Sequence, residues 1–286
     1  MSVHPTAIID PNVELDSSVD IGPRCVIDGH VRIEAGCKLY SHVYVTGWTQ
    51  IGPGCILHPN VVVGHEPQDL KYSGERSYCR IGSDTVLREN VTVHRGTLPE
   101  SETVIGKHCY LMVGSHVAHN GTLGDHVILT NNVLLAGHVS IGDHTNVGGG
   151  AAVHQFCRIG ERAMIAGHAA VARDVPPYAL VDREGRVLGL NRVGLRRAGV
   201  PQEEVRELRE VFRRLFGRQG DFSKAVEHLR EHAHGASAKR VFAFLNGEST
   251  RGVAGAARSG EPEMGESGEH GPADLNPRSG MEGCVE

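Results

Sequence analysis

Two histidines, His116 and His119, have the residue type and spacing that acid–base chemistry needs. Imidazole can accept a proton near neutral pH, so either ring could act as a general base toward a hydroxyl group. Eleven of the 18 histidines fall in two recurring phases of a six-residue repeat, where a surface or corner position explains them. His116 is alone in its phase, and His119 shares its phase only with His65. The pattern alone leaves both a functional and a structural role open for this pair.

A period of six residues governs most of the chain and must position these side chains. Stepping by six from Val3 to Val171, 26 of 29 positions are Ile, Leu or Val, and the exceptions are Asp69, Glu75 and Pro99. The residue two places earlier is nearly always small, and residues two apart point to the same face of a strand. Each hexad is therefore predicted to be one short strand and a turn. The pattern resembles that of hexapeptide-repeat proteins, so we expect a left-handed parallel β-helix with three hexads in each coil.

The expected coil length places distant residues side by side. Residues 18 apart should stack on adjacent coils, so Gly137 lies against His119. If the second break in the repeat adds one hexad, His94 lies beneath Ala118, the neighbour of His119. One wall would then hold a base candidate beside a glycine whose backbone N–H can stabilise an oxyanion.

Breaks in the repeat and changes in composition divide the chain. Loops are expected at 64–80 and 95–104, and loops on a rigid scaffold often carry function. The expected organisation is a β-helix over 1–175, a polar connector over 176–190, a helical domain over 191–247 and a disordered segment over 248–286. The fold class is thus an all-β solenoid with a C-terminal helical domain.

Composition and charge restrict the function classes. Aromatic residues make up 5% and there are 37 glycines, which favours a thin core of small aliphatic side chains. No apolar run approaches the roughly 18 residues of a membrane span, and no secretory signal opens the chain, so a cytoplasmic location is expected. Segment 191–247 carries 12 basic and 7 acidic side chains, which fits an acidic protein partner. No nucleic-acid partner is expected.

Zinc binding is the competing chemistry for these histidines. A gamma-type carbonic anhydrase uses the same kind of β-helix, with three histidine ligands of which two are five residues apart. Here the close pair is three apart, and no pair with a spacing of five fits near His94. Six of the seven cysteines occupy the small inward phase, as core residues do. We therefore expect no metal.

Eight short motifs follow one another in an order that resembles a known family. They are VHPTAI (3–8), QDLKYSGE (68–75), TVHRGT (92–97), VGSHVAHN (113–120), LAGHVSIGDH (135–144), AVHQFCRIG (152–160), VARDVPPY (171–178) and GLNRVGLRR (189–197). Together they resemble the acyl-(acyl-carrier-protein)–UDP-N-acetylglucosamine O-acyltransferases of lipid A biosynthesis. The resemblance covers residues 1 to about 247.

The resemblance implies an activity and a role for individual residues. The family moves a 3-hydroxyacyl chain from the thioester of acyl carrier protein to the 3-hydroxyl of UDP-N-acetylglucosamine. His119 matches the general base, and the Gly137 N–H matches the oxyanion donor. Residues that match substrate contacts are Asp69, Lys71, His94, His116, His138 and Gln155, with Asn191 and Arg197 at the uridine end.

The resemblance also implies an oligomeric state and the absence of a resident cofactor. The family forms a homotrimer whose sites lie between neighbouring β-helices, and the basic helical segment would dock the acidic carrier protein. The acyl group passes directly to the sugar, so no resident cofactor is expected. The 4′-phosphopantetheine arrives on the acyl carrier protein.

Some positions depart from the family pattern or leave alternatives open. Relatives usually have Asp after the catalytic histidine, whereas this chain has Asn120, which predicts a weaker base. Gly167 matches the acyl-chain ruler and leaves room for a long chain. The acceptor could instead be the 3-amino analogue of the sugar, and a catalytically idle β-helix scaffold is the alternative from another class.

Overall fold

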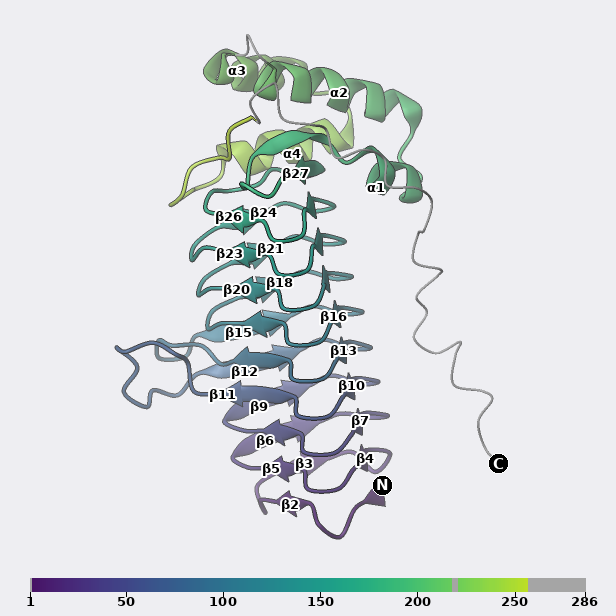
Figure 1. Ribbon diagram of the computed structural model, residues 1–286, viewed down its shortest axis with the longest axis vertical. Coiled ribbons are helices and arrows are strands. Elements are labelled where there is room, and N and C mark those ends of the chain that lie inside the picture. The colour runs from purple at the N-terminus through teal and green to yellow at the C-terminus, as the bar shows by residue number, and fades with distance from the viewer. Residues whose placement is uncertain (1, 218–220, 257–286) are drawn as a thin grey trace.

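The computed structural model describes residues 2–217 and 221–256, and its main part is a left-handed parallel β-helix (Figure 1). Sheet A contains β1 (Ser2–Val3), β4 (Asp20–Ile21), β7 (Lys38–Leu39), β10 (Ile56–Leu57), β13 (Val86–Leu87), β16 (Tyr110–Leu111), β19 (Ile128–Leu129), β22 (Asn146–Val147), β25 (Met164–Ile165), β27 (Ala179–Val181) and β28 (Val187–Leu190). Sheet B contains β2 (Ile8–Ile9), β5 (Val26–Ile27), β8 (Tyr44–Val45), β11 (Val62–His65), β14 (Thr92–His94), β17 (His116–Val117), β20 (Leu134–Leu135), β23 (Ala152–Val153) and β26 (Ala170–Val171). Sheet C contains β3 (Glu14–Leu15), β6 (His30–Ile33), β9 (Trp48–Ile51), β12 (Tyr78–Ile81), β15 (Glu102–Ile105), β18 (Thr122–Leu123), β21 (Ser140–Ile141) and β24 (Arg158–Ile159).

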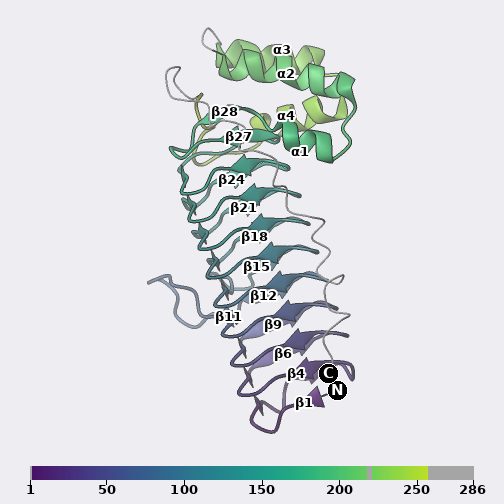
Figure 2. The same ribbon diagram turned by 45° about the vertical axis from the view of Figure 1, so that its right-hand side comes forward.

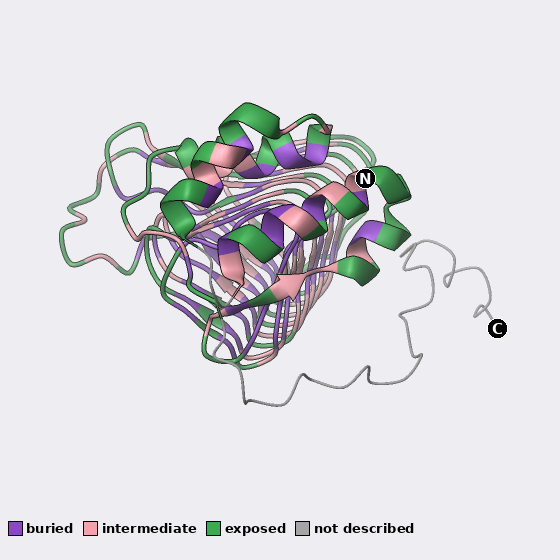
Figure 3. Ribbon diagram, turned by 90° about the horizontal axis from the view of Figure 1, so that it is seen from above, coloured by how far each residue is buried: buried purple, intermediate pink, exposed green. Residues whose placement is uncertain are grey.

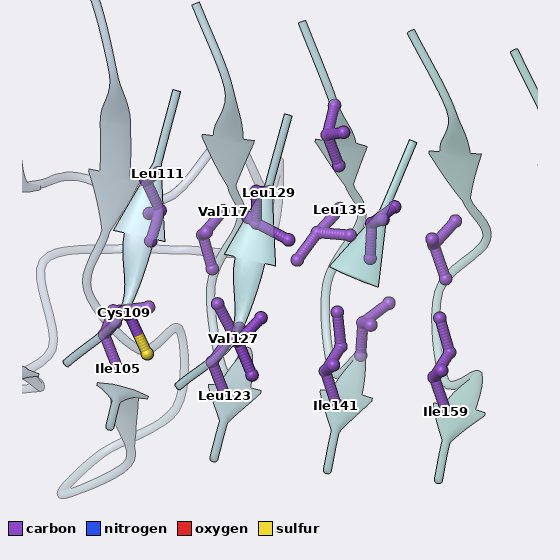
Figure 4. Packing of buried hydrophobic residues seen from close by; sticks show 14 of the residues in the cluster. Ile105, Cys109, Leu111, Val117, Leu123, Val127, Leu129, Leu135, Ile141 and Ile159 are labelled. Carbon is purple, nitrogen blue, oxygen red and sulfur yellow. The ribbon is translucent and has the colours of Figure 1, made fainter. Parts of the chain in front are cut away.

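The core of the solenoid consists of the two inward residues of each hexad. In one hexad Val127 and Leu129 are fully buried, while Ile128 between them is partly exposed. Leu129 pairs with Val147 of the next coil, 18 residues on, as the repeat predicts. The same stacking continues from coil to coil, so buried positions recur along the ribbon (Figure 3) and a column of aliphatic side chains fills the tube (Figure 4).

The corners of the coils use one recurring turn position with a positive φ angle. Non-glycine residues adopt it repeatedly, among them His108, His126 and His144, with φ between 53° and 57°. The rings of these three histidines stack on one another, with centroids 4.9 and 4.6 Å apart. These histidines belong to a recurring phase of the repeat, and their corner position explains them without a catalytic role.

Both predicted loops leave the β-helix at the same corner, between sheets B and C. The first spans 66–77, because β11 extends to His65 and β12 begins at Tyr78. The second spans 95–101, between β14 and β15. The predicted bounds, 64–80 and 95–104, are too wide because flanking residues complete ladder pairs, such as Tyr78 with Trp48 and Glu102 with Tyr78. The first loop projects well away from the coils (Figure 1).

The expected polar connector over 176–190 is instead an extension of the β-helix. Val175 bridges Ile159, and β27 adds to sheet A beside β25 before it turns back antiparallel into β28. Ala179, Val181 and Val187 are buried in this hairpin. The prediction is wrong because the charged residues between the two strands hide their short apolar alternation.

Four helices cover the end of the last coil (Figures 1 and 3). They are α1 (Arg192–Arg197), α2 (Gln202–Phe216), α3 (Phe222–His232) and α4 (Ala236–Asn246). Pro201 and Asp221 precede α2 and α3 as N-cap residues, as the sequence indicates, and the Asp221 carboxylate accepts the Lys224 N–H. Leu208 and Phe212 of α2 are buried among the helices, which closes the open end of the solenoid core.

The prediction of disorder from residue 248 is wrong for residues 248–256. This segment returns to the last coil, where Val253 bridges Asp174 and Ala256 bridges Val187. Ala254 is buried, and backbone hydrogen bonds join Asp174 to Gly252 and Ala254. The segment is short and rich in small residues, so its low apolar content did not predict that it packs on the last coil. Residues 257–286 of the predicted segment lie outside the described residues.

Two further observations concern cysteines and membrane helices. Cys25, Cys37, Cys55, Cys79, Cys109 and Cys157 are buried free thiols in the inward phase, as predicted for core residues. Within the described ranges, no helix has the length and apolar character required to cross a bilayer.

Candidate active site

His119 lies in the turn after β17, at the corner where both loops emerge. The pairing of Val117 with Leu135 puts Gly137 in register with His119 on the next coil, which confirms the predicted stacking. A Cβ atom on Gly137 would lie 2.6 Å from Nε2 and 2.5 Å from Cε1 of His119. The imidazole therefore packs directly against the glycine, in space that any side chain would occupy.

The hydrogen bonds of His119 determine which ring nitrogen is free. Its Nδ1 lies 3.0 Å from Asn120 Oδ1, and the same oxygen accepts the Thr97 backbone N–H at 3.1 Å. Because that oxygen is an acceptor, Nδ1 carries the ring proton and Nε2 keeps the lone pair that a general base needs. The Asn120 backbone N–H donates to Thr103 Oγ1 at 2.8 Å, which holds the turn.

Three further predicted histidines gather around this ring. The ring centroids of His119 and His138 are 5.2 Å apart, and those of His94 and His116 are 4.9 Å apart, both in edge-to-face contact. His138 also stacks on Phe156 with centroids 4.6 Å apart. The ladder pairs Val93 with Val117, so His94 lies one coil below Ala118, as the second loop's extra hexad predicts.

The environment favours the neutral form of these three neighbours. Burial, and then the neighbouring His116, lower the pKa of His94 to about 4. Burial also lowers the pKa of His116 and of His138, with His119 as the next cause in each case. At neutral pH each ring can donate one hydrogen bond and accept another. The His94 Nδ1 is buried and has no partner among the described residues, whereas His116 Nδ1 bonds Thr92 Oγ1 at 2.7 Å.

Asp69 and Lys71 come to the same corner on the first loop. Asp69 Oδ1 accepts the Lys71 backbone N–H at 3.0 Å, and Oδ2 accepts the Thr97 hydroxyl at 3.2 Å. The Lys71 N–H bond is the main cause that lowers the pKa of Asp69, and the nearby His119 contributes. The carboxylate is therefore ionised next to the base candidate. Lys71 itself is exposed.

Gly137 and Gln155 continue this corner toward the helical end. The Gly137 carbonyl accepts the Phe156 N–H at 3.1 Å. Within residues 2–217 and 221–256, no acceptor binds the Gly137 N–H, which leaves this donor free for a developing oxyanion. The pairing of Leu135 with Val153 places Gln155 one coil beyond Gly137, and its side chain is exposed.

Three other predicted site residues do not join this cluster in one chain. Gly167 lies in a turn between sheets A and B, where an added Cβ would meet Gly149 O at 3.4 Å. Arg197 is exposed on α1, which Figures 1 and 2 show on the side of the β-helix opposite the first loop. Asn191 caps α1, with Oδ1 accepting the Gly194 N–H at 2.9 Å and Nδ2 donating to Arg162 O at 2.9 Å.

Sequence reasoning missed two threonines that hold the site together. Thr97 and Thr103 are 94% and 100% buried, and both bond to Asn120. Thr97 stands at the end of the TVHRGT motif, but its bond to Asn120 uses the backbone N–H, which every residue but proline has. The residue type at position 97 therefore could not predict this hydrogen bond.

The described ranges contain no group of three or more His, Cys, Asp and Glu side chains arranged to hold a metal ion. The histidines of the corner instead contact one another through ring edges and faces. The donor geometry of this corner thus suits hydrogen bonding to a substrate.

Comparison with known proteins adds independent findings. Residues 174–254 match the family described as UDP N-acetylglucosamine O-acyltransferase, domain 2, and residues 30–65 match the bacterial transferase hexapeptide repeat. An acyl-(acyl-carrier-protein)–UDP-N-acetylglucosamine O-acyltransferase of Trichlorobacter lovleyi is 49% identical over 88% of this chain and 99% of its own length. The enzyme with the same name from Neisseria meningitidis is 44% identical over 88% of this chain and 98% of its own length.

Solved structures agree with these relatives. The UDP-N-acetylglucosamine O-acyltransferase of Moraxella catarrhalis superposes with a TM-score of 0.85 at 36% identity, covering 89% of this chain and 100% of the other. The UDP-N-acetylglucosamine acyltransferase of Francisella novicida gives 0.85 at 33% identity, covering 88% and 94%. The likeness includes the β-helix and the helical end together.

Proposed function

This chain belongs to the acyl-(acyl-carrier-protein)–UDP-N-acetylglucosamine O-acyltransferase family, and we propose that His119 is its general base. The chain transfers an acyl group from acyl carrier protein to UDP-N-acetylglucosamine, the first step of lipid A biosynthesis. The observation that carries the assignment is the geometry of the corner: His119 Nε2 packs against Gly137, and neither this nitrogen nor the Gly137 N–H has a hydrogen-bond partner among the described residues.

The reaction needs one base and one oxyanion donor. His119 Nε2 takes the proton of the sugar 3-hydroxyl while that oxygen attacks the thioester carbonyl of the acyl carrier protein. The Gly137 N–H stabilises the negative charge on the carbonyl oxygen. The intermediate expels the pantetheine sulfur, and the proton on Nε2 passes to that sulfur. The acyl group goes directly to the sugar, so the chain needs no cofactor of its own, and 4′-phosphopantetheine enters on the carrier protein.

The surrounding side chains suit the polar parts of the substrates. Asp69 is an ionised acceptor for sugar hydroxyls, and Lys71 is a flexible cation that can meet a diphosphate. Burial keeps His94, His116 and His138 neutral. Each can therefore donate a hydrogen bond to the substrate without adding a positive charge to the site. Gln155 extends the same wall toward the helical end.

A complete site requires residues from a second chain, and this supports a homotrimer. Asn191, Arg197 and Gly167 match the uridine contacts and the acyl-chain ruler, yet they lie away from the His119 corner within one chain. A neighbouring β-helix that presents this side to the corner would bring them in. Because the Asn191 side chain already caps α1, Arg197 is the freer of the two uridine contacts.

The helical domain suits the carrier protein. Arg206, Arg209, Arg213 and Arg214 are exposed on α2, and only the last two pair with Glu210. The whole segment 191–247 carries 12 basic and 7 acidic residues, so an acidic partner would gain long-range attraction from it. We also propose a cytoplasmic location, because the buried cysteines are free thiols, the state kept by a reducing compartment.

A substrate panel tests the proposed function. Purified protein is supplied with 3-hydroxyacyl carrier proteins of several chain lengths and with UDP-N-acetylglucosamine or its 3-amino analogue. We expect transfer to the hydroxyl sugar, with a preference for long acyl chains because Gly167 leaves room beside Gly149. Transfer to the 3-amino analogue alone would overturn the assignment of the acceptor. No transfer with any donor would overturn the proposed activity.

A further inference from the structure

A single residue, Thr97, connects the base to both loops. Its backbone N–H donates to Asn120 Oδ1 at 3.1 Å, and its hydroxyl donates to Asp69 Oδ2 at 3.2 Å. It belongs to the second loop, whereas Asp69 belongs to the first. Only 6% of Thr97 is exposed, so water competes little for these bonds.

The Thr97 N–H matters because residue 120 is an asparagine. An amide has one accepting end and one donating end, and the two have nearly the same shape. With the oxygen end held by Thr97, the same oxygen faces His119 Nδ1 at 3.0 Å. The Nδ1 then carries the proton, and Nε2 is free to act as the base.

The opposite orientation of the amide would reverse this arrangement. An NH2 group facing Nδ1 would require a lone pair there, which moves the ring proton to Nε2 and removes the base. A carboxylate at position 120 would accept through either oxygen and would not need a partner to orient it. The asparagine of this chain therefore makes the orientation depend on Thr97.

We propose that Thr97 is a positioning residue whose backbone N–H fixes the Asn120 amide, and through it the tautomer of His119, while its hydroxyl holds Asp69 beside them. The proposal rests on the proposed function, because it concerns the same base. It assigns no contact between Thr97 and the substrate.

The first test reads the tautomer of His119 without any turnover. Protein labelled with 15N in its histidines gives imidazole 1H–15N correlation patterns that differ between the two neutral tautomers, and the His119→Gln variant identifies the signal. We expect the neutral ring to be the Nδ1–H tautomer. A signal from the Nε2–H tautomer would overturn the proposal, even if the enzyme turns over.

The second test removes the N–H and asks whether a carboxylate replaces it. Thr97→Pro loses the hydroxyl as well as the N–H, so Thr97→Val is its reference, and we expect kcat about five- to tenfold below that of Thr97→Val, the effect of losing one hydrogen bond that selects the productive state. The double variant Thr97→Pro/Asn120→Asp should return to the kcat of Asn120→Asp, since a carboxylate needs no orientation. General damage to the loop would not be rescued in this way.

A side-chain variant separates the two bonds of Thr97. Thr97→Val keeps the N–H and loses the hydroxyl, so it should raise KM for the nucleotide sugar more than it lowers kcat.

An unchanged kcat in Thr97→Pro relative to Thr97→Val, or a folded double variant without rescue, would overturn the proposal. If Thr97→Pro does not fold, the tautomer of the wild type decides. Absence of turnover in the wild type would instead overturn the proposed function, while the tautomer still reports on Thr97.

Discussion

At the scale of single residues, His119 depends on neighbours that cannot be exchanged freely. Gly137 is required because its missing side chain leaves the space that the imidazole occupies. Asn120 provides the acceptor that places the proton on Nδ1, although it lacks the charge that would favour imidazolium. The proposed base is therefore well placed and only moderately activated.

Gly137→Ala should inactivate the enzyme without unfolding it. The new methyl would lie 2.5–2.6 Å from the His119 ring, so the imidazole must move. We expect kcat to fall about a hundredfold, as for a displacement of roughly 1 Å in a reacting group. Gly255→Ala is the matched control, because nothing lies within 4 Å of its added Cβ. Steady-state kinetics of both variants measure the effect, and equal rates would reject the packing argument.

His94 should make stability depend on pH. Its pKa is lowered from 6.5 to about 4 in the folded chain, so between these values the unfolded chain binds more protons. The free energy of unfolding is then fully kept above pH 6.5 and falls as the pH drops toward 4. We expect His94→Gln to remove roughly 1–3 kcal/mol of this fall. Urea titrations of both proteins at pH 7, 6 and 5 test this, and parallel pH dependence would contradict it.

Residue types alone identified most of the corner but not its internal bonds. His119, His116 and His138 could be selected because they depart from the repeat or stack beside it. Thr97 could not, since its backbone N–H acts on Asn120 and has no residue signature. The roles of Asn191 and Arg197 remain predictions, because they rest on family resemblance and lie away from the corner.

At the scale of elements, the repeat determines the register, and the loops determine the site. The pairing of His116 with Thr92 across 24 residues, rather than 18, follows from the extra hexad in the second loop. That offset was predictable because the period returns in phase after the loop. The hairpin of β27 and β28 was not, because strands of three or four residues leave too little pattern to separate them from a connector.

The returning segment 248–256 should stabilise the last coil. A chain ending at Gly247 loses the backbone bonds of Asp174 with Gly252 and Ala254, and that of Val187 with Gly255. We expect a loss of about 2–5 kcal/mol, given about 1 kcal/mol for each buried hydrogen bond and the exposure of Asp174. Thermal unfolding measures it, with a chain ending at Ala256 as the control. If both truncations melt at the same temperature, the segment contributes nothing.

At the scale of the whole molecule, the predicted site residues fall into two groups on different sides of one chain. The corner of His119 lies with the loops, and Arg197 lies on the opposite side of the β-helix. Cyclic assemblies place such unlike surfaces against each other. The homotrimer that we propose would bring the halves together three times.

Mixing two impaired variants should restore activity if the site spans two chains. His119→Ala and Arg197→Ala each damage a different half, so a mixed trimer contains some sites with both halves intact. Each trimer that contains both variants has one complete site of three, so about a third of the sites are complete once trimers with both tags are selected. Coexpressed variants are purified through two different tags and assayed at limiting nucleotide sugar. Activity no higher than that of the separate variants would show that each chain holds its own site.

The most direct test of the account compares transfer from a 3-hydroxyacyl carrier protein to UDP-N-acetylglucosamine by the wild type, His119→Ala and Asn120→Asp. We expect turnover by the wild type, a loss of about a hundredfold or more in His119→Ala, and faster turnover in Asn120→Asp, because a carboxylate favours the imidazolium that forms. Undiminished transfer by a correctly folded His119→Ala would contradict the assignment of the base and, with it, the mechanism.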